Sequence, residues 1–251
     1  MKKELVIAKF KEDMTWINQD AVINSYDKIY IYDKSLPSQY FNTCQSPYSD
    51  KVILNSLPNI GREAHTYLHH IIRNYDNLSD IVTFVQGKPF DHCQNFIERI
   101  QKIEEELKHP TNYKFIENDS LIYYSSLFHE HTHDYYSTCE FDGNIHQALP
   151  LKDSFMILFP DSKLIPLRFF YGGGAQFSML KESILQHSKS FYLSAMNFAY
   201  YGKTSIQNWC DSYNKKEISE PAHVFERLWS LIFTNNLNAL IKKGKFEEKT
   251  S

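Results

Sequence analysis

Three short apolar runs, separated by segments with helical spacing, constrain the fold of this chain most strongly. They are Glu4–Phe10 (ELVIAKF), Lys28–Tyr32 (KIYIY) and Ile81–Val85 (IVTFV). Near-continuous apolar runs of this length are typical of strands buried on both faces of a parallel sheet. Because they alternate with helical patterns, they predict an α/β fold with a mostly parallel central sheet flanked by helices. We expect Leu5–Lys9 to pair in parallel with the other two runs.

The segment Leu57–His92 has the clearest order of elements. Turn residues at Leu57–Gly61 precede a helix expected over residues 62–75, whose apolar residues recur three and four positions apart and face the sheet. The strand Ile81–Val85 follows, and the loop Gln86–His92 leaves its carboxyl end. Because ligands bind beyond the carboxyl ends of the strands in such sheets, this loop is the first candidate for a binding site.

The downstream segments are shorter and less regular. We expect helices at Phe96–Leu107, Leu180–Gln186 and Pro221–Lys243, and strands at Lys114–Ile116, Ser120–Leu127 and Phe155–Phe159. The chain shows no internal repeat, low-complexity segment or linker that would divide it. It therefore predicts one domain over residues 1–243 and a polar tail over residues 244–251.

The charge and cysteine patterns exclude several classes of protein. A formal net charge of −3 gives no basic surface for a nucleic-acid backbone. Cys44, Cys93, Cys139 and Cys210 are widely spaced, which fits a reducing compartment and suggests neither a zinc knuckle nor a disulfide framework. No apolar run reaches the roughly 18 residues of a membrane helix. We expect a cytoplasmic protein, with at most peripheral contact at the inner face of the membrane.

Two histidine groups are candidate metal ligands. His129, His131 and His133 alternate along the chain, so a strand would place all three imidazoles on one face. Neighbours on one face of a strand are about 6–7 Å apart, which makes a shared metal difficult, and a polar loop is the alternative. His65 and His69 lie one helical turn apart without an HExxH pattern, so a helix-surface pair, or one histidine in the cleft, is the simpler interpretation.

The glycine run Gly172-Gly173-Gly174 is a third candidate. It has neither the Gly-Lys-Ser/Thr ending of a P-loop nor the GxGxxG spacing of a dinucleotide fold. A backbone without Cβ atoms lets a ligand approach closely, but a tight turn between a strand and a helix needs the same residues. Both interpretations stay open on this pattern alone.

Five segments of the chain resemble a known family. AKFKEDMTWI, IYIYDKS, LPNIGREAHTYLHHIIRNYDNLSDIVTFVQGKPFDH, GGGAQFSMLKESI and FERLWSLIF are similar to an uncharacterised fungal and bacterial family of glycosyltransferase-like proteins of the GT-A type. The similarity extends from about Glu4 to Phe233. It implies a single GT-A-like, Rossmann-like domain that binds a nucleotide-sugar donor.

The resemblance implies a donor-phosphate site in the loop after Ile81–Val85. GT-A enzymes usually have an Asp-x-Asp pair there, which holds Mg²⁺ or Mn²⁺ against the diphosphate. This chain has Gln86-Gly87-Lys88 instead, and its nearby carboxylate is Asp91, the one candidate metal ligand. Lys88, Arg62 or His92 would then supply positive charge in place of the metal.

The same resemblance assigns roles to residues elsewhere in the chain. Asp33 corresponds to the position that binds the base or ribose, and the segment Gly172–Gln176 to the wall between donor sugar and acceptor. Glu226 corresponds to the carboxylate that takes the proton of the acceptor hydroxyl in inverting enzymes, with Asp91 and His92 as further catalytic candidates. The alternative for Glu226 is an exposed helix carboxylate paired with Arg227 or a lysine.

These assignments predict a glycosyltransferase of bacterial surface polysaccharide (capsule) biosynthesis. It would move a sugar from a nucleotide-sugar donor to a glycan or lipid-linked acceptor. One alternative is a metal-dependent hydrolase that uses His129, His131 and His133. The other is a non-catalytic relative that binds sugar nucleotides or glycans.

Overall fold

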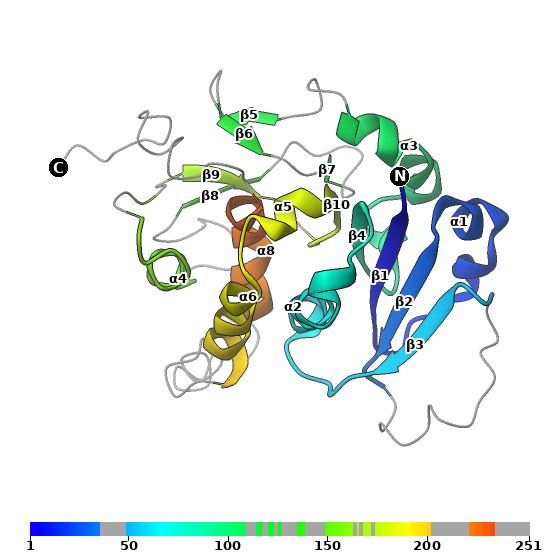
Figure 1. Cartoon of the computed structure of the whole chain (residues 1–251), viewed down its shortest axis with the longest axis horizontal. Helices are drawn as coiled ribbons and strands as arrows, with labels where there is room; N and C mark the ends of the chain where they lie inside the picture. The colour runs from blue at the N-terminus through cyan, green and yellow to red at the C-terminus, as the bar shows by residue number, and fades with distance from the viewer. Residues whose placement is uncertain are drawn as a thin grey trace.

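We describe a computed structural model of the chain over residues 1–35, 49–108, 114–116, 120–122, 125–126, 135–138, 149–162, 165, 168–171, 174–201 and 221–233 (Figure 1). Its strands are β1 (Lys3–Lys9), β2 (Lys28–Asp33), β3 (Val52–Ser56), β4 (Ile81–Gln86), β5 (Lys114–Ile116), β6 (Ser120–Ile122), β7 (Ser125–Ser126), β8 (Tyr135–Thr138), β9 (Arg168–Tyr171) and β10 (Phe177–Leu180). Its α-helices are α1 (Asp20–Ser25), α2 (Arg62–Asn74), α3 (Phe96–Lys108), α4 (Leu151–Leu158), α5 (Lys181–Leu185), α6 (Lys189–Met196) and α8 (Pro221–Ile232). Short 3-10 turns η1 (Thr15–Asn18), η3 (Tyr75–Asn77) and η4 (Pro89–Asp91) and a π-helix, η6 (Asn197–Tyr201), complete the described elements.

A six-stranded mixed sheet in the order β3-β2-β1-β4-β10-β7 forms the centre of the molecule. The first four strands are parallel, and β10 and β7 add an antiparallel edge. Leu5 of β1 pairs with Ile29 of β2 on one side and with Thr83 of β4 on the other. The expected parallel pairing of the three apolar runs is therefore confirmed, and the fold is α/β and Rossmann-like.

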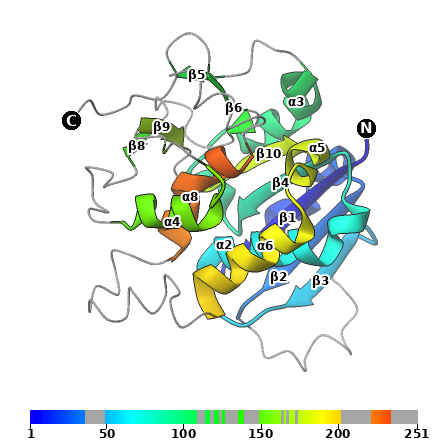
Figure 2. The ribbon, with the colours of Figure 1, turned by 60° about the vertical axis from the view of Figure 1, so that its left-hand side comes forward.

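Alternation along the strands sends side chains to two separate hydrophobic clusters. Leu5, Ile7 and Ile29 contact the cluster that includes α1 and α3, whereas Val6 and Tyr30 contact the cluster that includes α2, α6 and α8. Successive residues of a strand point to opposite faces, so a sheet covered on both sides needs continuous apolar runs. Figure 1 shows α2 and α6 on one face of the sheet and α1 on the other, and Figure 2 shows α2 and α6 in front of β1, β2 and β3.

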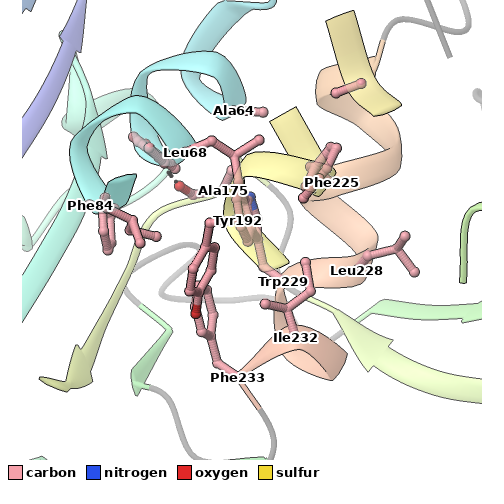
Figure 3. Packing of buried hydrophobic residues seen from close by; sticks show 14 of the residues in the cluster. Ala64, Leu68, Phe84, Ala175, Tyr192, Phe225, Leu228, Trp229, Ile232 and Phe233 are labelled. Atoms are coloured by element: carbon pink, nitrogen blue, oxygen red, sulfur yellow. Dashed lines mark hydrogen bonds between the residues drawn. The ribbon is translucent and has the colours of Figure 1, made fainter. Parts of the chain in front are cut away.

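Helix α8 contributes a large aromatic group to the second cluster (Figure 3). The ring of Trp229 stacks on Phe233 with centroids 5.4 Å apart and contacts Phe225 at 5.1 Å. Phe177 of β10 lies 5.9 Å from Trp229, and Tyr67 of α2 lies 6.2 Å from it. These rings fix α8 against α2 and the end of the sheet, although the two helices are far apart in the sequence.

Several expected elements differ from the structure. The segment Phe155–Phe159 was expected to be a strand, but it lies mostly within helix α4, because Leu151, Phe155 and Leu158 bury one helical stripe. The expected strand Ser120–Leu127 is divided into β6 and β7. The helix expected from about Leu180 to Gln186 is α5, whose N-cap residue, Leu180, is also the last residue of β10. The helix expected over residues 221–243 is described as far as Ile232, and the polar tail lies outside the described residues.

A membrane-spanning helix was not expected from the sequence. Among the residues that the structure describes, no helix combines the length and the apolar character needed to cross a membrane.

Candidate functional site

A pocket of about 300 Å³ lies at the carboxyl ends of the parallel strands. Its lining residues come from the ends of β1 and β4, from the residue after β2, and from the start of α2: Ala8, Lys9, Phe10, Glu12, Lys34, Asn59, Arg62, Glu63 and Gln86. Strands β2 and β3 lie on one side of β1, and the next strand, β4, lies on the other. The pocket is therefore at the point where the strand order reverses, which is where open α/β sheets bind ligands.

Two lysines at strand ends set the charge on one side of the pocket. Lys9 Nζ lies 2.5 Å from Asp33 Oδ2, so the ends of β1 and β2 are joined by an ion pair. Lys34 is buried, and its Nζ donates to the carbonyl oxygens of Ile60 (2.7 Å) and Arg62. Burial lowers the pKa of Lys34 to about 8, because the charged form loses its hydration there.

The turn that begins α2 has an uncommon backbone conformation. Gly61 and Arg62 have φ values of +61° and +46°, in the region that favours glycine. Tyr200 of the π-helix η6 covers this turn and donates its hydroxyl to the Gly61 carbonyl oxygen at 3.1 Å. Lys34 on one side and Tyr200 on the other therefore hold the turn so that Arg62 and Glu63 face the pocket.

Glu63, in the first turn of α2, has an altered acidity. Burial, and in second place the carboxylate of Glu226, raise the pKa of Glu63 to about 7, against the opposing charges of Arg62 and Lys34. A carboxyl group with such a pKa exchanges protons near neutral pH, which is a property of acid–base groups in active sites.

Glu226 of α8 lies next to this region. Its carboxylate accepts a hydrogen bond from the Gly174 amide and pairs with Arg227. The side chain of Glu226 is 14% exposed and that of Arg227 is 3% exposed. The Arg227 guanidinium also stacks on the ring of Tyr171 at 4.6 Å. Glu226 is not among the pocket-lining residues. It affects the pocket by raising the pKa of Glu63, which does line it.

The strand-end loop and the glycine segment, predicted separately, meet in the structure. Gln86 Nε2 donates to the Gly174 carbonyl oxygen at 2.9 Å, and Gln176 Nε2 donates to that of Pro89 at 3.1 Å. Gly174 has φ +81°, and a Cβ atom there would lie 2.8 Å from Cγ of His92. Gly174 is thus required both by its backbone angle and by the close approach of the imidazole.

Other predicted residues lie apart from the pocket or outside the described chain. Lys88 and Asp91 form an ion pair with each other at 2.9 Å, are 61% and 57% exposed, and do not line the pocket. Asp33 does not line it either, but accepts hydrogen bonds from Lys9 and from Ser35 just behind the wall. Five further candidates lie outside the described residues: Gly172, Gly173, His129, His131 and His133.

His65 and His69 of α2 are not a helix-surface pair, because His65 is buried, and the other expectation, one histidine in the cleft, is not met by the pocket, which no described histidine lines. His65 is buried, and its Nε2 lies 2.9 Å from the Tyr201 hydroxyl. Burial lowers the pKa of His65 to about 3, which keeps the imidazole neutral. His70 is also buried, and its Nε2 lies 3.0 Å from Glu4 Oε1 on the side of α2 away from the pocket.

Sequence reasoning missed five polar residues that line the pocket: Lys9, Glu12, Lys34, Asn59 and Glu63. Lys9 and Lys34 had a detectable signal, because each stands within two residues of the end of a predicted strand. Glu63 had a weaker one, its place in the first turn of a helix that follows a glycine. Its acidity depends on Glu226, which the sequence does not place beside it.

Together, the sheet order and the strand-end pocket define a Rossmann-like α/β protein with a pocket at its switch point. Residues 5–245 match the model of the family described as "Protein of unknown function (DUF3431)", and the chain belongs to that family. A search of curated proteins finds no match to the chain.

Proposed function

We propose that this chain is a glycosyltransferase of the GT-A type that binds a nucleotide-sugar donor in the strand-end pocket. The acceptor would be a glycan or a lipid-linked sugar of surface polysaccharide assembly. The observation that supports this most is the position of the pocket. It lies beyond the ends of β1 and β4, and three cations line it, Lys9, Lys34 and Arg62, together with the carboxylates of Glu12 and Glu63.

The charges in the pocket suit a diphosphate. Lys34 and Arg62 stand on the side formed by the turn before α2, and Lys9 stands at the end of β1. Positive groups placed in this way stabilise the negative charge that develops on a departing nucleoside diphosphate. Lys88, which the resemblance offered for this role, is paired with Asp91 at the surface.

Among the described residues, the candidate ligands do not come together as a magnesium or manganese site. In the described part of the chain, no group of three or more His, Cys, Asp or Glu side chains is arranged to hold a metal ion. The candidate ligand Asp91 is engaged by Lys88, and Asp33 by Lys9. We therefore propose no step that passes through a metal and assign the diphosphate to Lys34 and Arg62.

Transfer also needs a group that takes the proton of the acceptor hydroxyl. In the proposed reaction the acceptor oxygen bonds to the anomeric carbon, the bond to the diphosphate breaks, and the hydroxyl proton passes to a carboxylate. Glu226 is the proposed base, because the Gly174 amide and Arg227 hold its carboxylate in place beside Glu63. His92 lies against Gly174 and would contact the same region.

The test combines binding and turnover. Sugar nucleotides with different bases and sugars are screened by thermal shift, since a ligand of the folded state raises the melting temperature. The best binder is then assayed for transfer or hydrolysis. Arg62→Gln should weaken binding at least about tenfold, because it removes a charged partner of the phosphate. Arg73→Gln is the matched control, an exposed arginine at the other end of α2.

Each outcome decides between classes of function. Binding with turnover supports a transferase, and binding without turnover supports a non-catalytic sugar-nucleotide protein. If no sugar nucleotide binds, or if Arg62→Gln and Arg73→Gln bind it equally well, the proposal is wrong.

A further inference from the structure

Two carboxylates line the pocket, those of Glu12 and Glu63. Glu12 Oε2 accepts a hydrogen bond from the Phe10 amide at 2.6 Å, whereas Glu63 forms no ion pair with another described residue. Asp33 is paired with Lys9 at 2.5 Å, and Glu226 is paired with Arg227. Lys34, the nearest cation on the β2 side, directs its Nζ to the carbonyl oxygens of Ile60 and Arg62. The carboxyl of Glu63 is thus left facing the space that a ligand would fill.

The charged groups around Glu63 come from three elements. Arg62 is its neighbour on α2, Lys34 follows β2, and Glu226 belongs to α8. Across the pocket, Lys9 and Glu12 stand at and after the end of β1. Burial and the carboxylate of Glu226 raise the pKa of Glu63, whereas the two cations Arg62 and Lys34 lower it. The result is the raised pKa of about 7.

We propose that Glu63 binds a phosphate group of the ligand as a neutral carboxylic acid, so that ligand binding takes up a proton from solvent wherever Glu63 is ionised in the free protein. This inference rests on the proposed function only in assuming that the pocket receives a phosphorylated ligand. An ionised carboxylate at the pocket wall would repel a phosphate held by Lys34 and Arg62. A protonated one instead donates a hydrogen bond to a phosphate oxygen, and O–H donors to anionic oxygens make short, strong bonds.

The consequence is a reciprocal link between anion binding and protonation. An anion that binds more tightly when Glu63 is protonated must raise the pKa of Glu63 when it is bound. A pKa near 7 means that the proton is largely present at pH 6 and largely absent at pH 7.5. Anion affinity should therefore fall about fourfold between these two values.

Sulfate is the probe, because its charge does not change in this pH range and because it does not depend on the identity of the sugar or base. The carboxyl ¹³C resonance of Glu63 is identified by its absence in Glu63→Gln and titrated by NMR with and without saturating sulfate. We expect a midpoint near pH 7 without sulfate and a higher midpoint with it. Sulfate affinity is measured in parallel from the shifts of the pocket amides at pH 6.0 and 7.5.

Two variants separate Glu63 from other titrating groups. Glu63→Gln should bind sulfate at pH 7.5 at least as well as wild type and show less than about twofold dependence on pH in this range. Glu98→Gln, at an exposed carboxylate paired with Lys102, should behave as wild type. Lys34 retains most of its charge up to pH 7.5, so its titration contributes little to the measured change.

The inference is overturned by a Glu63 midpoint below pH 5, by a midpoint that sulfate leaves unchanged, or by sulfate that does not perturb the pocket amides at pH 6. If sulfate binding is proton-linked but no sugar nucleotide binds, this inference stands and the proposed function is wrong. If a sugar nucleotide binds and the midpoint of Glu63 does not change, the proposed function stands and this inference is wrong.

Discussion

Helix α2 lies between two carboxylates that the protein treats differently. Near the carboxyl end of α2 lies Glu4 of β1, which is completely buried. Each of its carboxylate oxygens has a partner: His70 Nε2 at 3.0 Å and Ser79 Oγ at 2.9 Å. Tyr32 and Asn74 contact the other ring nitrogen of His70, at 3.0 and 3.2 Å.

In the first turn of the helix, Glu63 faces a pocket, next to the second carboxylate, Glu226. A buried network in which the polar groups pair with one another stabilises the fold. A carboxylate that lines a cavity without a paired cation can instead bind a ligand. The comparison predicts that changes at the Glu4 end alter stability and that changes at the Glu63 end alter function.

The largest effect is expected for Glu226→Gln at the pocket end. If Glu226 is the base, transfer should fall by roughly 10²- to 10⁴-fold, because the amide has nearly the same size but cannot take the proton. Donor affinity should change far less than the rate, because Glu226 is not among the residues that line the pocket. Single-turnover kinetics and direct titration of the donor give the two values. A wild-type rate in the variant would remove Glu226 from the chemistry, and lost donor binding would make it a ligand-binding residue.

Next in size is Glu4→Ala at the opposite end of α2. Removing one partner of a buried pair should lower the free energy of unfolding by about 3–5 kcal/mol, because His70 Nε2 and Ser79 Oγ lose their partner inside the core. Urea denaturation measures the change. Glu98→Ala, at an exposed pair with Lys102, should stay within about 0.5 kcal/mol of wild type. A loss below about 1 kcal/mol for Glu4→Ala would mean that this network does not stabilise the fold.

Glu63→Gln should raise the free energy of unfolding, whereas Glu4→Ala lowers it. The pKa of Glu63 is about 7 in the folded protein and near its ordinary value of 4.5 when unfolded, so the folded state binds more protons between these values. Stability from this group is therefore lost as the pH rises from about 4.5 to 7, and stays lost above pH 7. Gln carries no charge, so the variant should be more stable than wild type at pH 8, by roughly 2–3 kcal/mol.

The pH dependence of that difference provides the control. At pH 5 the folded wild type is already largely protonated, and the advantage of Glu63→Gln should shrink to below about 1 kcal/mol. Urea denaturation at both pH values measures it. A variant that is less stable than wild type at pH 8 would show that the Glu63 carboxylate is well paired, and the contrast with Glu4 would disappear.

The sequence predicts a structural feature of this protein well where neighbouring residues determine that feature, and poorly where residues far along the chain determine it. Strands β1, β2 and β4 were predictable, because strands covered on both faces must be apolar throughout. Residues 155–159, FMILF, could not be assigned in the same way, because a short apolar run fits a buried strand and a buried helix equally well. The partners that bury Leu151 and Phe155 decide the outcome, and they lie on other elements.

The site divides along the same line. Gln86 was predicted to belong to it because it ends a strand of the parallel sheet, and position alone sufficed. Glu63 was missed because its acidity comes from burial and from Glu226, on a helix far along the chain. Its role therefore depends on the aromatic contacts through which Trp229 and Phe233 hold α8 against the sheet. No local pattern around Glu63 contains that information.

The smallest predicted effect concerns the turn that brings Glu63 to the pocket. Gly61→Ala places a Cβ atom at φ +61° and in steric clash with Cε1 of the Tyr200 ring. The left-handed backbone costs an alanine about 1 kcal/mol relative to glycine. The Tyr200 ring must also move, which disturbs the bond from its hydroxyl to the Gly61 carbonyl oxygen. We expect a total loss of about 1–2 kcal/mol of stability and weaker sulfate binding, because Arg62 and Glu63 shift with the turn.

A double-mutant cycle with Tyr200→Ala separates the two causes of this loss. In the Tyr200→Ala background the ring contact is gone, so Gly61→Ala should cost only the backbone contribution, about 1 kcal/mol. An equal cost in both backgrounds would show that the ring moves away freely and that Lys34 alone fixes the turn. If Gly61→Ala changed neither stability nor sulfate binding, the start of α2 would be adaptable rather than held. Sulfate binding at the start of α2 would then depend on the charges of Lys34, Arg62 and Glu63 and not on the geometry of the turn.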